Sequence, residues 1–466
     1  MSAVTKTRSL FIAAAILAVG FTGSARPSDF ARGSQAPPLD FSPLEKVVAE
    51  ELRNTGTPGG AVAVVLGDRV VYSRGFGIAN VETNEPVRPD MLFRLGSTTK
   101  MFTAAALVAL AERGALDLDR PVGSYVSGVN AQVGRVTANQ LLSHTSGFFD
   151  EAPMMGSHDE TALEKEVRSW SESRFFTEPG RIFSYSNPGY WFAGFLIEHA
   201  SHRKYADQLA ESIFGPLGMT RTTLRPLVAM TYPLAQGHEE TPQGPRVIRP
   251  AANNAASWPA GSIFSNVNDL SRFVIAFMND GHIDGKQVLA PAVIKRLSTP
   301  RAKIPGGEGS YGYGLQLAKS RGVDLVSHGG SRAGYGSSIR MVPSKKFGVI
   351  TVANRTGIGL NATVEKATEI ALSLEPRSTS TAAQSALTPA EMSAVAGTYS
   401  QGPRTVELLV RDGKLLLKQG SRETPLFKFG DQQIGTDNAA RWVVVRDANG
   451  AVEYLHAGSR SWLKVK

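Results

Sequence analysis

The chain has 466 residues, of which 42% are hydrophobic and 20% are charged, a composition typical of a globular protein with two or three domains. It contains no cysteine, which excludes disulfides, cysteine nucleophiles and thiolate metal sites. The formal net charge is +9, but the basic residues are scattered and form no run or helix face typical of nucleic-acid binding. We expect no nucleic-acid partner; the charge either aids solubility or attracts anionic polymers of a cell envelope.

The N-terminal residues have the pattern of a signal peptide. Lys6 and Arg8 form a positive region, residues 10–21 are apolar, and small residues at positions 23–25 suit cleavage after Ala25. An uncleaved membrane anchor is the alternative, although the apolar stretch is short for a span. We predict a signal peptide over residues 1–25, a poorly ordered lead over residues 26–40, and a periplasmic or secreted protein without a stable membrane span after cleavage.

Residues 41–374 show the patterns of one large α/β (α+β) domain. A helical stretch at residues 41–53 precedes two apolar strands, 61–66 and 69–74, which a Gly-Asp turn joins into a hairpin. This order predicts a mainly antiparallel sheet flanked by helices. Residues 148–164 have no periodicity and are either an insertion beside a site or a simple surface loop. Further helices are predicted at residues 101–110, 136–144, 190–200, 205–214, 268–278 and 361–374, and further strands at residues 311–315, 323–327, 337–342 and 347–354.

The C-terminal part has a different composition. Residues 375–387 are rich in Ser, Thr and Ala, which is typical of a linker. Beyond them, Asp-Gly at residues 412–413 and Asn-Gly at residues 449–450 stand between strand-like segments, which is a strong hairpin signal. We predict a small all-β domain over residues 388–466, with a short helix near its start.

Ser97 and Lys100 form the first candidate catalytic pair. They lie three residues apart at the start of an apolar helix, so one helical turn places both on the same face. A lysine that is partly desolvated has a depressed pKa and can accept the proton of a serine hydroxyl. Taken alone, the pair is more typical of an N-cap serine with a surface lysine one turn on than of a catalytic site.

Two further motifs follow in the chain. Tyr185 and Asn187 are two residues apart, and His328 precedes Gly329 and Gly330 at the end of a predicted strand. Alone, each has an ordinary structural interpretation as a core tyrosine, a turn-forming asparagine or a strand-end histidine. The eight histidines show no metal-ligand spacing, so we expect neither a metal nor another cofactor.

The three motifs together resemble those of the serine β-lactamase and penicillin-binding-protein superfamily. The resemblance covers roughly residues 40–375 and is strongest for the branch of class C β-lactamases, D-aminopeptidases, D-Ala-D-Ala carboxypeptidases and related esterases. Supporting segments are residues 93–100, 141–147 and 259–261. Three motifs in the family's order make a far more specific signal than any one of them.

The resemblance implies a role for each motif residue. Ser97 would be the nucleophile, and Lys100 and Tyr185 would relay protons, with Tyr185 as a phenolate favoured by the neighbouring ammonium. Asn187 would orient Lys100 and bind substrate. The backbone N–H groups of Ser97 and Ser331 would form an oxyanion hole, and His328, Gly329 and Gly330 would border the bound substrate.

One position departs from the β-lactamase pattern. True β-lactamases of this branch resemble one another in having Lys-Thr-Gly where this chain has His328-Gly-Gly, and a neutral histidine is a weaker partner for a substrate carboxylate. The resemblance therefore implies an exported serine hydrolase of the D-amino-acid peptidase or esterase type, acting on a small molecule or peptide such as a cell-wall-derived compound. The alternatives are a true β-lactamase, a penicillin-binding sensor and a non-enzymatic envelope-binding protein.

Overall fold

The computed structural model describes residues 39–374, 383–436 and 441–465. The predicted signal peptide, nearly all of the predicted lead and most of the predicted linker lie outside the described residues. Residues 1–39 and 40–466 are separate units, and the second is described below. Every helix in the described ranges is too short or too polar to cross a membrane.

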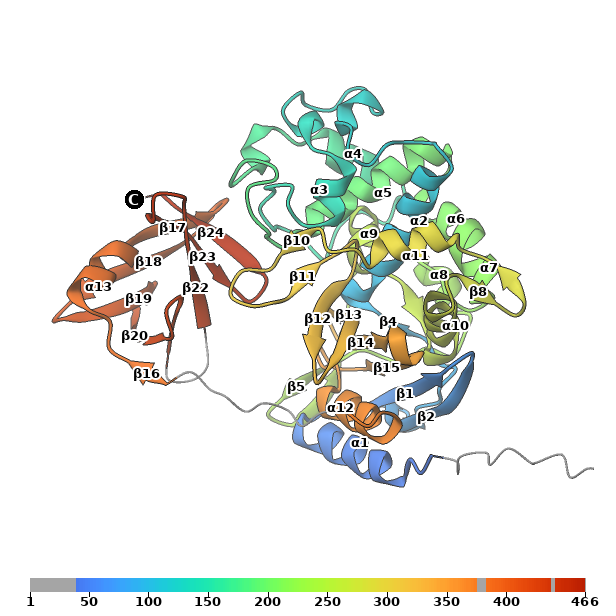
Figure 1. The fold of residues 1–466 in the computed structure, drawn as a ribbon. Helices are drawn as coiled ribbons and strands as arrows, with labels where there is room; N and C mark the ends of the chain where they lie inside the picture. Colours follow the sequence, from blue (N-terminus) through green and yellow to red (C-terminus); the bar gives the residue numbers. More distant parts are fainter. Residues whose placement is uncertain (1–38, 375–382, 437–440, 466) are drawn as a thin grey trace, which may run out of the picture. The chain divides into compact units, whose positions relative to one another are not determined.

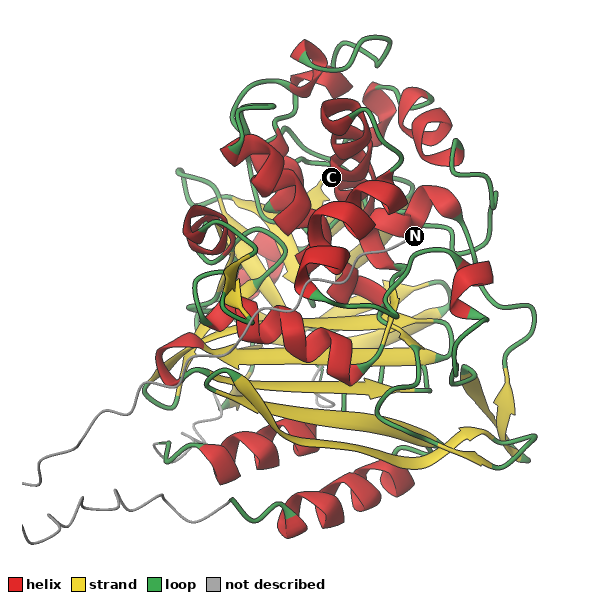
Figure 2. Cartoon of the chain, turned by 90° about the vertical axis from the view of Figure 1, so that its right-hand side faces the viewer, coloured by secondary structure: helices red, strands yellow, loops and turns green. Residues whose placement is uncertain are grey.

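A nine-stranded antiparallel sheet forms the centre of the larger domain (Figures 1 and 2). Its strand order is β10-β11-β12-β13-β14-β15-β1-β2-β3, so strands from both ends of the domain meet where β15 pairs with β1. The strands are β1 (Gly59–Leu66), β2 (Arg69–Asn80), β3 (Glu85–Pro86), β10 (Ala302–Lys303), β11 (Ser310–Tyr311), β12 (Gln316–Ser320), β13 (Val323–Arg332), β14 (Tyr335–Val342) and β15 (Phe347–Ala353).

Helices cover both faces of this sheet (Figure 2). Three two-stranded sheets are separate from the large sheet. They pair β4 (Phe93–Arg94) with β7 (Phe264–Ser265), β5 (His238–Thr241) with β6 (Gly244–Val247), and β8 (His282–Ile283) with β9 (Lys286–Gln287). The helices are α1 (Ser42–Asn54), α2 (Thr99–Glu112), α3 (Ala138–Leu142), α4 (Ala162–Arg168), α5 (Asn187–Ser201), α6 (Tyr205–Leu209), α7 (Gly215–Leu217), α8 (Pro226–Ala229), α9 (Trp258–Gly261), α10 (Val267–Met278), α11 (Pro291–Leu297) and α12 (Asn361–Ala371).

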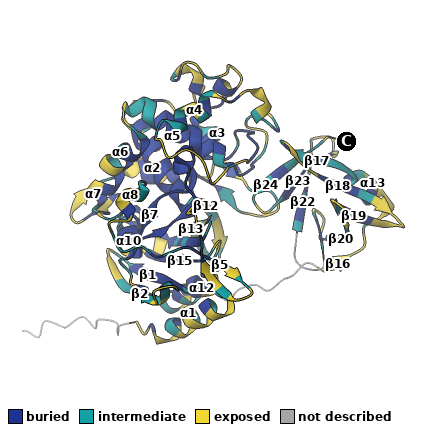
Figure 3. Ribbon diagram, turned by 180° about the vertical axis from the view of Figure 1, so that it is seen from behind, coloured by how far each residue is buried: buried dark blue, intermediate teal, exposed yellow. Residues whose placement is uncertain are grey.

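Strand β1 shows why the sheet has two apolar faces. Its alternate residues Val62 and Val64 pack with α1 and α12, whereas Ala61, Ala63 and Val65 pack into the core that contains α2, α5 and α10. A strand buried on both faces has a continuous apolar run instead of an alternating one. Figure 3 shows the buried residues concentrated in this sheet and in α2 and α5.

The C-terminal residues form an antiparallel barrel. Strands β17 to β24 pair in chain order, β24 pairs with β17, and β20 also pairs with β21. Helix α13 (Pro389–Val395) begins with a capping box between Thr388 and Glu391. The strands are β16 (Gln384–Ser385), β17 (Gly397–Gln401), β18 (Arg404–Arg411), β19 (Lys414–Gln419), β20 (Arg422–Phe429), β21 (Gln433–Gly435), β22 (Arg441–Arg446), β23 (Val452–Ala457) and β24 (Arg460–Lys464).

The predicted fold class is confirmed, with three local corrections. The His-Gly-Gly motif lies inside β13 and does not follow a strand that ends at residue 327. Helix α5 begins at Asn187, three residues before the predicted start at 190. Residues 312–315 of the predicted strand 311–315 form no strand, because β11 ends at Tyr311 and β12 begins at Gln316.

Candidate active site

Ser97 lies where a short strand leads into a buried helix. After β4, a single 3₁₀ turn (η1, Gly96–Thr98) runs directly into α2. The Thr98 and Ser337 hydroxyl oxygens are 2.7 Å apart, and the Ser337 hydroxyl also donates to the Leu95 carbonyl at 2.6 Å. These bonds fix the segment that carries Ser97 against strand β14.

Gly96 allows this segment to approach strand β13 closely. Its φ of +57° lies in the left-handed region, which favours glycine. A Cβ atom at this position would lie 2.5 Å from the backbone nitrogen of Ser331. The absence of a side chain at Gly96 therefore lets the backbones of residues 96–97 and 331 lie side by side.

Lys100 is fully buried beside Ser97. Its Nζ donates at 2.7 Å to the side-chain oxygen of Asn187 and at 2.7 Å to the backbone carbonyl of Ala260, and it lies 3.3 Å from Ser97 Oγ. Burial lowers the pKa of Lys100 well below 10.5. The physical setting therefore favours the neutral amine.

The hydrogen bonds of Lys100 assign a direction to its lone pair. A neutral amine has two N–H donors and one lone pair, and the two carbonyl oxygens at 2.7 Å require both donors. The remaining neighbour is Ser97 Oγ at 3.3 Å, to which an ammonium at Lys100 would donate a third bond. In the neutral amine the lone pair would point to this hydroxyl instead, as a general base requires.

Tyr185 lies over the other side of Lys100, whose Nζ is 4.8 Å from the centre of the ring. Burial raises the pKa of Tyr185, and this effect exceeds the lowering by the nearby Ser97 hydroxyl. His144 stacks on Tyr185 at 4.1 Å between ring centres, and its own pKa is lowered by burial. The expected phenolate at Tyr185 does not fit these surroundings, which favour the neutral phenol.

Asn187 is held at the start of α5 by Asp150. Its backbone N–H and its side-chain NH₂ group donate to the same carboxylate oxygen of Asp150, at 2.8 and 3.0 Å. Both donors point to Asp150, so the side-chain oxygen of Asn187 is turned to Lys100. Asp150 lies in the segment for which the sequence left a surface loop and an insertion beside a site as alternatives.

Two arginines of the barrel hold Asp150. The side chain of Asp150 is 7% exposed, and its second carboxylate oxygen accepts a bond from Arg460 Nε at 2.8 Å and another from the Arg460 terminal nitrogen. Arg404 donates to the Asp150 backbone carbonyl at 2.7 Å. Asp150 therefore lies between the proposed catalytic residues and the barrel.

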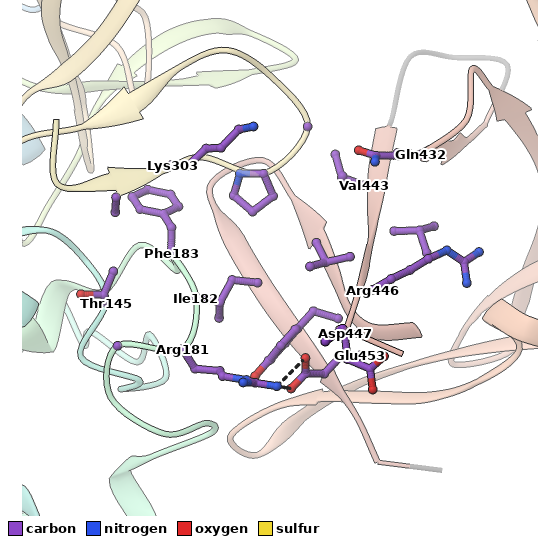
Figure 4. Close-up of a pocket in the computed structure, with 18 of the residues that line it drawn as sticks. Thr145, Arg181, Ile182, Phe183, Lys303, Gln432, Val443, Arg446, Asp447 and Glu453 are labelled. Carbon is purple, nitrogen blue, oxygen red and sulfur yellow. Dashed lines mark hydrogen bonds and ion pairs between the residues drawn. The ribbon is translucent and has the colours of Figure 1, made fainter. Parts of the chain in front are cut away.

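The Ser97 side chain opens into a cavity of about 160 Å³. Ser331 and Asn187 line it, together with residues 152–154 and with Arg332, which donates to the Gly261 carbonyl at 3.3 Å. A larger cavity of about 860 Å³ lies between residues 181–183 and the barrel, where Figure 4 shows Arg181 paired with Glu453. None of the predicted site residues lines the larger cavity.

The His-Gly-Gly motif is placed differently from the prediction. His328 is 3% exposed, Tyr311 lies 2.9 Å from its Nε2, and burial lowers its pKa to about 3. The residues that line the Ser97 cavity include Ser331 but not His328, Gly329 or Gly330. A Cβ atom at Gly330 would collide with the Leu95 carbonyl, so this glycine serves the packing of β13 against the Ser97 segment.

Sequence reasoning missed Asp150, Arg460 and Arg404. Asp150 lies in an aperiodic loop, and the arginines lie more than 250 residues further on in the barrel, at separations of 310 and 254 residues. Gly96, His144 and the Ala260 carbonyl lie in segments that the family resemblance had marked. Among the described residues, no group of three or more His, Asp or Glu side chains is arranged to hold a metal ion.

A family model described as Beta-lactamase matches residues 44–372. The unguisins hydrolase ungD of Aspergillus violaceofuscus is 30% identical over 364 residues, which cover 69% of this chain and 63% of that protein. The D-aminopeptidase of Gluconobacter oxydans is 29% identical over 307 residues, which cover 64% of this chain and 56% of that protein. This chain thus spans less than two thirds of the length of either relative.

The fold is similar to solved structures over most of its length. The crystal structure of SurE with D-Leu matches with a TM-score of 0.74 at 24% sequence identity, covering 91% of this chain and 99% of that one. At this identity the likeness concerns the fold alone.

Proposed function

This chain belongs to the β-lactamase family, and we propose that it is a serine hydrolase that cleaves an amide or ester through an acyl-enzyme on Ser97. The observation that carries the proposal is the buried Lys100 amine 3.3 Å from Ser97 Oγ, held there by bonds of 2.7 Å to the Asn187 side-chain oxygen and the Ala260 carbonyl. We expect D-amino-acid amides or simple esters as substrates ahead of β-lactams. The name of the D-aminopeptidase of Gluconobacter oxydans supports the first class.

Acylation begins with proton transfer. Lys100 accepts the proton of the Ser97 hydroxyl while Ser97 Oγ attacks the substrate carbonyl, and the negative charge moves to the carbonyl oxygen. The backbone N–H groups of Ser97 and Ser331 stabilise this oxyanion, which the approach of Ser331 to Gly96 supports. The amine or alcohol then leaves with the proton that Lys100 holds, passed through the Tyr185 hydroxyl.

Deacylation repeats the same transfers with water. The neutral Lys100 accepts a proton from a water molecule, the resulting hydroxide attacks the acyl carbonyl, and Ser97 Oγ leaves and is protonated again. Tyr185 as a neutral phenol can donate a proton and receive another in each half-reaction. Lys100 is the base in both halves.

The surroundings of His328 argue against efficient β-lactam hydrolysis. A histidine whose pKa is lowered to about 3 carries no charge at neutral pH, and His328 does not line the Ser97 cavity. It therefore provides no cation for the carboxylate of a penicillin. We rank a β-lactamase or a penicillin-binding sensor below a peptidase or esterase for this reason.

Labelling with a fluorescent fluorophosphonate tests the nucleophile. We expect the purified protein to be labelled and Ser97→Ala to remain unlabelled, with Ser173→Ala, an exposed serine, as the matched control. Labelling that persists in Ser97→Ala would refute the assignment. Kinetics with p-nitrophenyl esters, D-amino-acid p-nitroanilides and nitrocefin rank the substrate classes, and faster turnover of nitrocefin by orders of magnitude would reverse the ranking.

Export is a separate part of the proposal and depends on the N-terminal pattern of Lys6, Arg8 and the apolar residues 10–21. We expect a full-length protein produced in a bacterium to reach the periplasm or medium and to begin at Arg26. N-terminal sequencing of the fractionated protein tests this, and an intact N-terminus in the cytoplasmic fraction would contradict it.

A further inference from the structure

The tip of one barrel hairpin lies against the proposed active site. Strands β23 and β24 are joined by Gly458, with a φ of +63°, and Ser459. The Tyr185 backbone N–H donates to the Ser459 carbonyl at 2.8 Å, and the Ser461 N–H donates to the Ser184 hydroxyl at 3.1 Å. The hairpin is thus bonded to the segment that carries Tyr185 and leads into Asn187.

Arg460, the first residue after this turn, starts a continuous path to the proposed base. Its guanidinium binds one carboxylate oxygen of Asp150. The other oxygen of Asp150 binds both donors of Asn187, and the Asn187 side-chain oxygen accepts a bond from Lys100. Every step in this path is a hydrogen bond between polar groups.

Arg460 fixes the carboxylate of Asp150. Burial of a carboxylate costs free energy, which pairing and hydrogen bonds offset. Arg460 is the cation that contacts the Asp150 carboxylate among the described residues, because Arg404 binds the backbone carbonyl of Asp150 instead. Loss of Arg460 would leave a buried negative charge beside Asn187.

We propose that Arg460 of the C-terminal barrel is a positioning residue of the hydrolase, which fixes Asp150 and through it the orientation of Asn187 and Lys100. The inference rests on the proposed function, because it assigns Arg460 to the network that orients the proposed base. It also gives the barrel a role in the reaction, because the β23–β24 hairpin supplies a part of the active site that residues 41–374 lack.

The same pair of charges acts on Lys100 from a distance. Asp150 raises the pKa of Lys100 and Arg460 lowers it, so the two charges act in opposite directions. The other polar groups around Lys100 are Tyr185, Tyr190, His144 and His328; burial favours the neutral form of all four. Removal of either charge should therefore shift the pKa of Lys100 in a known direction: upward without Arg460 and downward without Asp150.

The test measures the pH profile of kcat/KM for a p-nitrophenyl ester with the whole chain. Lys100 must be neutral to act, so activity rises as the pH passes through its pKa. For Arg460→Gln we expect the acidic limb to move up by roughly half to one pH unit, because Asp150 then acts alone. For Asp150→Asn we expect the limb to move down, because Arg460 then acts alone. Arg460→Lys should lie between wild type and Arg460→Gln.

Arg181→Gln is the matched control. It removes another arginine–carboxylate pair between the catalytic domain and the barrel, that of Arg181 with Glu453, which lines the larger cavity and not the Ser97 cavity (Figure 4). We expect its pH profile to match that of the wild-type protein. If Arg460→Gln does not fold, the acidic limb should still move down in Asp150→Asn and up in Arg460→Lys.

Unshifted limbs, or limbs that move in the same direction in Arg460→Gln and Asp150→Asn, would overturn the positioning role. This failure is distinct from failure of the proposed function. If Ser97→Ala abolishes labelling while the limbs stay fixed, Ser97 remains the nucleophile and the barrel has no part in positioning. If Ser97→Ala keeps its activity, the proposed function itself is wrong.

Discussion

Replacement of Gly96 by alanine tests whether the close approach of two backbones is needed for activity. The added Cβ would lie 2.5 Å from the nitrogen of Ser331 and 2.6 Å from its oxygen. Cβ atoms make essentially no contacts below 3.0 Å. The nitrogen of Ser331 must therefore move away by at least about 0.5 Å, the difference between 3.0 Å and 2.5 Å. This movement would displace the Ser331 backbone N–H, which is one of the two proposed oxyanion donors.

The expected loss of activity follows from this displacement. Removal of an oxyanion donor costs roughly 10²- to 10³-fold in kcat, and a donor displaced by half an ångström loses a large share of that. We therefore expect Gly96→Ala to lower kcat for a p-nitrophenyl ester by roughly 10- to 100-fold. The left-handed φ of +57° adds about 1 kcal/mol of strain to the folded state.

Gly114→Ala separates strain from displacement. Gly114 follows the other end of α2 and has a φ of +77°, but a Cβ atom there would meet no atom within 4 Å. Gly114→Ala should lose in urea unfolding only the stability that the left-handed φ costs, and its kcat should stay unchanged, whereas Gly96→Ala should lose kcat and more stability. Equal values of kcat in the two variants would refute the argument that Gly96 positions the Ser331 donor.

Two further predictions concern the buried titratable groups. Lys100→Arg should reduce kcat/KM by roughly 10³-fold at every pH up to 10, because a guanidinium does not become a neutral base; recovery of activity as the pH rises would show that another group is the base. The folded pKa of His328, about 3, lies below its ordinary 6.5, so the unfolded chain binds more protons and stability is lost as the pH falls below 6.5. This effect amounts to about 2 kcal/mol between pH 7 and pH 5, and urea unfolding of His328→Gln should show a pH dependence smaller by that amount. An identical pH dependence in the two proteins would mean that His328 is not held neutral.

Local sequence patterns predicted most of the fold. The hairpin of β1 and β2 and the positions of α2 and α3 follow from periodicity and turn residues within a few positions of each other. The proximity of Ser97 and Lys100 is equally local, because one helical turn separates them. Such features depend on neighbouring residues that a single sequence displays.

The surroundings of the site depended on contacts that no local pattern shows. Asp150 meets Arg460 across 310 residues, and nothing in an aperiodic loop or a barrel hairpin indicates that pairing. The state of Tyr185 was expected from an ammonium at Lys100, but the burial of both groups favours their neutral forms. Burial depends on the tertiary structure. The sequence therefore identified Lys100 and Tyr185 as site residues but could not predict their protonation states.

The loop that holds Asp150 also forms a wall of the Ser97 cavity, and its two parts are under different constraints. Asp150 is clamped by Asn187 and two arginines, whereas residues 152–154 line the cavity and the Met154 side chain is 48% exposed. Substitutions at residues 152–154 can reshape the space for the acyl group while the anchored root keeps its bonds. Substitutions at the tip of this loop should therefore change the substrate range of the proposed hydrolase without disturbing the bonds of Asp150.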